Sequence, residues 1–96
     1  LYNGNWNGAQ ILDPSWIAFT KKPSNGSDGV YGGHFWLNAG GKFPDVPKDM
    51  FSCNGFQGQR VWCIPSKDLV IVRTGLHEYP FFDINQFLSD IVSTIE

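Results

Sequence analysis

The clearest hydrophobic pattern lies at the C-terminal end of the chain. Apolar residues there recur at intervals of three and four positions, at Ile84, Phe87, Leu88, Ile91, Val92 and Ile95. This spacing is typical of an amphipathic α-helix, and Asp83 just before it is a favourable N-cap. We therefore predict a helix over residues 83–96, whose apolar stripe must pack against another element.

Shorter apolar runs, separated by glycine, proline and other turn-forming residues, predict β-strands at residues 30–38, 51–56, 59–64 and 69–74. The segment "PSKD" at 65–68 predicts a tight turn between the last two strands. The run "LVIVR" is almost wholly aliphatic, which indicates a strand covered on both faces. Pro44 and Pro47 exclude regular strand pairing from the irregular connector that precedes Met50.

The N-terminal region predicts turns and one short helix. Asn-Gly pairs at 3–4 and 7–8 have the composition of tight turns. Asp13 as N-cap and Pro14 at the first helical position predict a helix that ends before Pro23. We expect its apolar side to consist of Trp16, Ile17 and Phe19.

These elements predict an α+β fold, an antiparallel β-sheet with a C-terminal α-helix packed on one face. The 96 residues fit one domain, divided into a loop and short helix (1–29), antiparallel strands (30–75) and the C-terminal helix (83–96). We expect Trp36, Trp62 and the run from Leu69 to Val72 to fill the space between sheet and helix.

Composition limits the classes of function. The chain is 42% hydrophobic and 17% charged, which is typical of a globular protein. Its net charge is −2 and it has no basic stripe, so nucleic acid is not an expected partner. No apolar stretch is long enough to form a membrane-spanning segment. Aromatic residues make up 16% of the chain, which fits either a core of few large side chains or an aromatic binding surface.

Few side chains carry recognisable chemistry. No serine is followed by lysine in a Ser-x-x-Lys spacing, and no Gly-x-Ser-x-Gly is present. His34 and His77 lie far apart and no cluster has metal-ligand spacing, so we predict no metal site and no cofactor. Cys53 and Cys63 lie on two strands that can be neighbours, which leaves a disulfide or packed free thiols open.

The segment "CNGFQGQ" at 53–59 places two glycines beside a predicted strand. Glycine weakens an ordinary strand interior, so this pattern indicates a bulge, a tight turn or a ligand that approaches the backbone.

Three segments in order, "LYNGNWNGAQILDPSWIAF", "YGGHFWLN" and "GFQGQRVWCIPSKDLVIVRTG", resemble the C-terminal part of β-lactamase-related serine hydrolases. This family includes class C β-lactamases, D-alanyl-D-alanine carboxypeptidases, esterases and 6-aminohexanoate-dimer hydrolase. The resemblance covers nearly the whole chain and implies part of a β-lactamase/transpeptidase-like fold. The family's catalytic Ser-x-x-Lys and Tyr-x-Asn lie upstream of the matched region, and Tyr2, Tyr31 and Tyr79 do not supply Tyr-x-Asn.

The resemblance also implies site residues. Cys53, Asn54 and Gly55 align with the family's Lys-Thr-Gly or His-Thr-Gly, of which only the glycine is kept. Phe56 follows that glycine, at the position whose backbone N–H usually serves the oxyanion hole. A cysteine cannot replace the lysine charge, which argues against recognition of a penicillin-type carboxylate. The family thus implies a substrate-binding strand at 53–56, with the Phe56 amide as its catalytic group.

The intact hydrolase is expected to cleave a small-molecule amide or ester, in a periplasmic or cell-envelope location. The chain begins at Leu1 without an initiator Met or signal-peptide pattern, as a processed chain or fragment would. The isolated chain is expected to be inactive. Tyr31 and His34 are expected near the pocket or in the core, and residues 38–49 are expected to form a pocket-side loop.

Two alternatives belong to other functional classes. The aromatic, Asn and Gly content fits a non-catalytic module that binds carbohydrate or peptide through exposed tryptophans. An interaction domain that self-associates through a sheet face is the other alternative, because a part of a larger fold exposes apolar surface.

Overall fold

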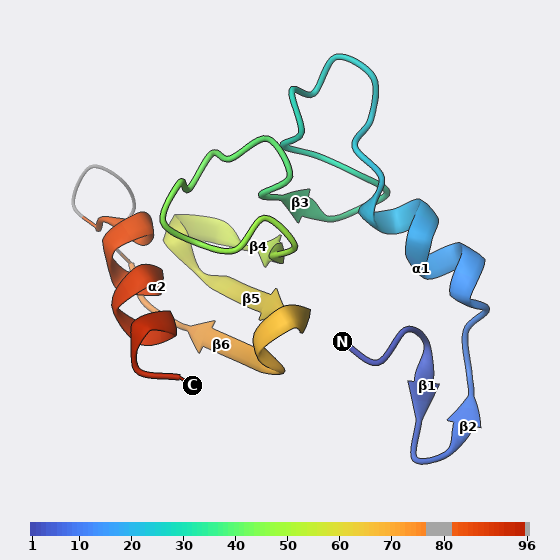
Figure 1. Cartoon of the computed structure of the whole chain (residues 1–96). Helices are drawn as coiled ribbons and strands as arrows, with labels where there is room; N and C mark the ends of the chain where they lie inside the picture. Colours follow the sequence, from blue (N-terminus) through green and yellow to red (C-terminus); the bar gives the residue numbers. More distant parts are fainter. Residues whose placement is uncertain (77–81, 96) are drawn as a thin grey trace.

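The structure, a computed structural model, describes residues 1–76 and 82–95. Two antiparallel sheets are present, a small one of β1 and β2 and a larger one in the order β3-β4-β5-β6. The elements are β1 (Asn5–Trp6), β2 (Ala9–Gln10), α1 (Pro14–Lys21), β3 (Trp36–Leu37), β4 (Phe51–Asn54), β5 (Arg60–Ile64), β6 (Leu69–Arg73) and α2 (Ile84–Ser93). The predicted α+β class, with a C-terminal helix beside an antiparallel sheet, is confirmed (Figure 1).

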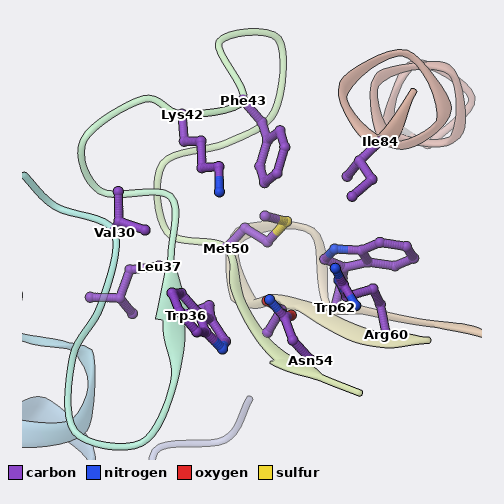
Figure 2. Close-up of a pocket in the computed structure, with 11 residues that line it drawn as sticks. Val30, Trp36, Leu37, Lys42, Phe43, Met50, Asn54, Arg60, Trp62 and Ile84 are labelled. Atoms are coloured by element: carbon purple, nitrogen blue, oxygen red, sulfur yellow. The ribbon is translucent and has the colours of Figure 1, made fainter. Parts of the chain in front are cut away.

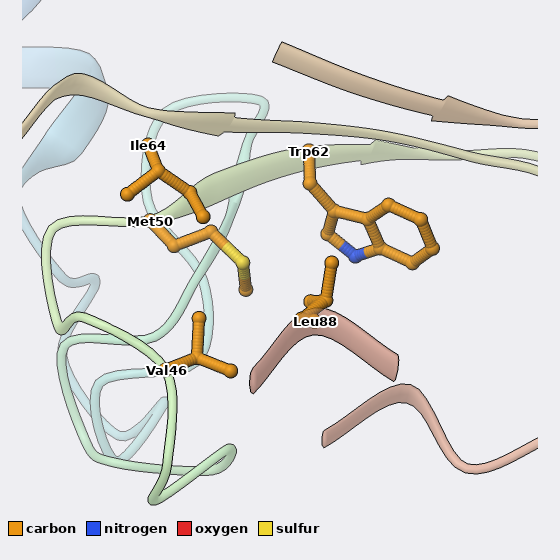
Figure 3. Close-up of a cluster of buried hydrophobic side chains, with 5 residues drawn as sticks. All are labelled: Val46, Met50, Trp62, Ile64 and Leu88. Carbon is orange, nitrogen blue, oxygen red and sulfur yellow. The ribbon is translucent and has the colours of Figure 1, made fainter. Parts of the chain in front are cut away.

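The C-terminal helix α2 begins and packs as its sequence predicts, but it ends at Ser93, so Ile95 of the predicted stripe lies beyond it. The Asp83 side chain accepts a hydrogen bond from the Gln86 N–H at 3.0 Å, which caps the helix. Leu88 is fully buried and lies in one cluster with Trp62 and Ile64 of β5 (Figure 3). Among the described residues, no helix is long and apolar enough to cross a bilayer.

The two faces of the larger sheet differ in what covers them. Trp62 pairs with Ile71 and Ile64 pairs with Leu69, so these four side chains share the face that packs against α2. Val70 and Val72 point the other way and remain 47% and 63% exposed. The prediction that β6 is covered on both faces is wrong, because α2 lies on one face only.

The predicted strand at 30–38 is also wrong in part, because this segment folds back on itself. Only Trp36–Leu37 forms a strand, and Tyr31 pairs with Trp36 as an isolated bridge. Between them the Gly32 N–H donates to the Phe35 carbonyl at 2.9 Å, which closes a turn. The glycines suit this turn, since a Cβ at Gly32 would collide with the carbonyl of Thr20 at the end of α1.

Trp36 does not fill the space between sheet and helix. It is 42% exposed and packs edge-on against Tyr31, with ring centroids 4.9 Å apart. The fold-back places Tyr31 directly beside it, whereas Trp62 in the centre of β5 is 1% exposed and fills the core as predicted.

The N-terminal arm (residues 1–22) has the predicted turns and helix. Asn7 and Gly8 both have positive φ and join β1 to β2, as a two-residue hairpin requires. The Asp13 carboxylate accepts a hydrogen bond from the Ser15 N–H at 2.8 Å and caps α1. The Ser15 hydroxyl also bonds this carboxylate, and these hydrogen bonds lower the pKa of Asp13.

The apolar side of α1 is not buried as expected. Trp16 and Phe19 stack on each other with ring centroids 5.5 Å apart, and both remain exposed. Figure 1 shows that α1 and the β1–β2 hairpin lie on the side of the larger sheet away from α2. The core therefore consists of one sheet face, α2 and the loop between β3 and β4.

That loop (residues 38–50) is organised by Asn38, which is fully buried. Its Nδ2 donates to the carbonyl oxygens of Phe43 and Val46 at 3.0 Å and lies 3.1 Å from that of Pro47. Its Oδ1 accepts from the Phe43 N–H at 2.8 Å. One side chain thus replaces the strand pairing that the prolines exclude, and the loop delivers Val46 and Met50 to the core.

Replacing Asn38 with alanine is expected to destabilise the fold strongly. The substitution leaves the buried Val46 carbonyl without a donor and the Phe43 N–H without an acceptor, at a cost of about 1–3 kcal/mol for each unsatisfied group. Chemical denaturation should show a loss of roughly 2–4 kcal/mol in the free energy of unfolding. Asn25→Ala, in an exposed loop, is the matched control and should change it by less than about 0.5 kcal/mol. Equal stability of the two variants would contradict the role of Asn38.

Candidate functional site

The four residues predicted to bind substrate lie where β4 leaves the sheet. Cys53 and Asn54 end β4, and Gly55 and Phe56 lead into the tight turn that joins β4 to β5. Strand β3 pairs only with Phe51 and Ser52. In the described part of the chain, no strand pairs with Cys53 or Asn54 on that edge, so the end of β4 has one open edge.

The backbone directs the Phe56 amide toward this open edge. The Gly55 N–H donates to the carbonyl of Gln59, the residue just before β5, at 2.7 Å. Gly55 is extended, with φ −116° and ψ 178°, so the next N–H points to the opposite side. The Phe56 N–H is thus directed away from β5, and the Phe56 ring is exposed.

The two glycines of "CNGFQGQ" differ in whether their backbone conformation requires glycine. Gln57 and Gly58 both have positive φ, at 56° and 84°, and lie inside a turn in which the Gln59 N–H donates to the Phe56 carbonyl. Gly58 therefore suits the tight turn between β4 and β5. Gly55 has ordinary strand geometry, and a Cβ there would lie 3.4 Å from the Cβ of Gln59, an ordinary contact. The fold itself does not require glycine at 55.

The predicted residues form one continuous stretch of backbone, but the side chains of Cys53 and Asn54 lie on opposite faces of the sheet. Cys53 pairs with Val61 and lies on the sheet face away from α2, together with Val70 and Val72. Asn54 points to the α2 face, and its Oδ1 accepts a hydrogen bond from the Ser52 hydroxyl at 2.8 Å. Alternation along β4 thus separates the two side chains.

The two cysteines are free. Cys53 lies opposite Val61 and Cys63 lies opposite Phe51, so the two thiols are diagonal neighbours on one face and not a directly paired couple. Cys53 is exposed and Cys63 is half-buried, and burial raises the pKa of the Cys63 thiol. The structure therefore favours free thiols, although Cys53 is not packed.

The remaining predicted residues lie elsewhere. His34 is exposed in the turn after Gly32, with φ 71°, and His77 lies outside the described residues, as does Tyr79. Within residues 1–76 and 82–95, no three His, Cys, Asp or Glu side chains lie together as a metal site requires.

The loop that was expected to lie beside a pocket, at 38–49, lines a cavity on the α2 face of the sheet, but its cationic lining was not predicted (Figure 2). Its polar lining comes from Lys42 of the loop, Ser52 and Asn54 of β4, and Arg60 of β5. Lys42 and Arg60 are 18 positions apart, and only the Asn54–Arg60 pairing and the fold of the loop bring them to one cavity. The glycine-containing segment "GFQG" at 55–58 is the sequence signal for a turn between these strands, and such a turn predicts the pairing of Asn54 with Arg60.

Comparisons with known proteins found no match, whether against protein-family models, curated proteins or solved structures.

The two glycines of the turn are expected to respond differently to substitution. Gly58→Ala forces a side chain into the left-handed region and should lower the free energy of unfolding by about 1–2 kcal/mol. Gly55→Ala, the matched control, should change it by less than about 0.5 kcal/mol, since its Cβ meets only ordinary contacts. Urea denaturation of both variants measures the difference, and a larger loss for Gly55→Ala would contradict the assignment.

Proposed function

We propose that this chain is the C-terminal sheet-and-helix portion of a β-lactamase-related serine hydrolase with a β-lactamase/transpeptidase-like fold. In the intact enzyme a serine from outside this chain attacks a small-molecule amide or ester. The Phe56 N–H stabilises the oxyanion, and water hydrolyses the acyl-enzyme. Cys53, Asn54 and Gly55 form the strand along which the substrate lies.

The observation that carries this proposal is the open edge of β4. An oxyanion hole needs a backbone N–H that is held in place and is not consumed by the fold. The Gly55–Gln59 hydrogen bond fixes the local backbone, and alternation of the extended chain directs the next amide away from β5. A backbone N–H can donate whatever side chain its residue carries, so phenylalanine at 56 is compatible with this role.

The exposed sheet face supports the same proposal. Cys53, Val70 and Val72 lie on it and are exposed, and α2 covers the opposite face. Exposed apolar surface of this kind is typical of a face that packs against another part of a larger protein. The nucleophile of a hydrolase would then approach the end of β4 from the side of Cys53.

The upstream coding sequence tests the class directly. We expect it to encode Ser-x-x-Lys followed by Tyr-x-Asn, with the serine on the order of 200 residues before Leu1. An open reading frame that contains neither motif would refute the proposal. Hydrolysis or a serine acyl-enzyme formed by the 96-residue chain alone would contradict the expectation that it is inactive without that segment.

In the hydrolase encoded by the whole reading frame, Phe56→Pro is expected to lower kcat about 10²–10³-fold, because it removes one oxyanion donor. Phe56 does not have a positive φ, and the extended Gly55 before it is compatible with a following proline. Phe56→Ala, the control, removes the ring but keeps the N–H and should retain activity within about tenfold. Steady-state kinetics on an ester substrate compares the two, and equal losses would show that the ring and not the amide matters.

A carbohydrate-binding module is the second candidate, and the exposure of the indoles favours it. Trp6, Trp16 and Trp36 are 66%, 45% and 42% exposed, whereas Trp62 alone is buried. Trp6 and Tyr2 also line a shallow hollow with the side chains of Asn5 and Asn7. Aromatic rings with amide groups at their rim are suited to the apolar face and the hydroxyls of a sugar.

Tryptophan quenching tests whether these indoles are available in solution. Acrylamide should quench most of the fluorescence of the native chain, and Trp6→Phe should reduce the accessible fraction while Trp62→Phe should not. Mostly shielded indoles would count against an aromatic platform. Glycan-array binding that is lost in Trp6→Ala would favour the module over the hydrolase.

A further inference from the structure

The cavity on the α2 face of the sheet has a consistent electrostatic character. It lies on the face opposite Cys53 and shares Asn54 with the proposed hydrolase strand, and among the described residues it is lined by Lys42 and Arg60 with no acidic side chain. The chain as a whole carries a net charge of −2. Two cations that face one small cavity without a carboxylate create a local positive potential inside an acidic protein.

The polar side chains in the cavity have donors left for a ligand. Arg60 uses one terminal nitrogen, which donates to the carbonyls of Gly55 and Gln59 at 3.1 Å and 2.9 Å. These bonds hold the guanidinium in place, and its other nitrogens make no hydrogen bond to the described residues. The Ser52 hydroxyl donates to Asn54 Oδ1, which turns the Asn54 amide so that its Nδ2 remains a donor. In Figure 2 the Lys42 side chain reaches from the loop toward the same space.

Two indoles form walls of the cavity, Trp36 of β3 and Trp62 of β5. The cavity has a volume of about 60 Å³. A water needs roughly 10–15 Å³ of such space, so a group of four or five heavy atoms fits. This is the size of a carboxylate with its adjoining carbon or of a phosphate group.

We propose that this cavity binds a small oxyanion group, a carboxylate or a phosphate, between Lys42 and Arg60 with the Asn54 amide as a third donor. Charge-assisted hydrogen bonds from lysine and arginine are the strong contacts that such anions make in proteins. The indole walls lower the local dielectric and strengthen these contacts. The site does not depend on the proposed hydrolase activity.

The test is a titration of the whole 96-residue chain by NMR, with sodium phosphate and sodium acetate in parallel and with sodium chloride at equal ionic strength as the blank. Saturable shifts are expected for the indole N–H resonances of Trp36 and Trp62, which line the cavity. Trp6 and Trp16 lie outside it and serve as internal controls. A response to phosphate alone or to acetate alone supports the site and identifies the group it takes.

Lys42→Gln should weaken binding about tenfold or more, the loss expected for one charge-assisted hydrogen bond. Lys67→Gln, a cation in the turn between β5 and β6, is the matched control and should leave the affinity within about twofold. Lys42 is exposed, so its variant should fold, whereas Arg60→Gln also removes hairpin contacts and serves as a second variant. No saturable shift with either anion, equal shifts of all four indoles, or equal weakening in both lysine variants would each overturn the proposal.

Discussion

The buried amide of Asn38 is the interaction on which the arrangement of sheet, loop and helix depends. Its side chain bonds backbone groups at Phe43, Val46 and Pro47, and its N–H donates to the Met50 carbonyl. The loop contains prolines and cannot form a ladder of its own, so the Asn38 side chain supplies the partners of the Val46 carbonyl and the Phe43 N–H. Because the loop is held, Val46 and Met50 meet Leu88 of α2, and Lys42 lies above the cavity.

The sheet separates two kinds of surface. One face carries the core, α2 and the cavity with its two cations, and the other carries Cys53, Val70 and Val72 exposed. The open edge at the end of β4 lies between these two faces, because it consists of backbone groups that β3 does not pair with. Alternation along a strand explains this division, since Asn54 and Cys53 are neighbours in sequence but serve opposite sides. Asn54 belongs to both proposed sites, since it ends β4 and its side chain lines the cavity.

Elements with strong local signals were predictable. The stripe from Ile84 to Ile95 and the capping residues Asp13 and Asp83 act within a few positions of the helices they start, so the sequence specifies both. The turns at Asn7-Gly8 and 65–68 are equally local. The candidate strand at 53–56 came from a family resemblance, which named the residues but not the open edge or the direction of the Phe56 amide.

The sequence by itself determined where helices begin, where the chain turns and which strands carry apolar side chains. Only the tertiary structure decided which of those side chains are buried. The strand "LVIVR" has two apolar faces, but only one of them packs against α2. Trp36 lies in a segment that folds back onto Tyr31. Trp16 and Phe19 of α1 stack on each other and stay exposed. The fourfold bonding of Asn38 and the meeting of Lys42 with Arg60 were likewise invisible, because both depend on contacts between segments that only folding brings together. Local propensity acts over a few residues, whereas burial and electrostatic environment are properties of the packed chain.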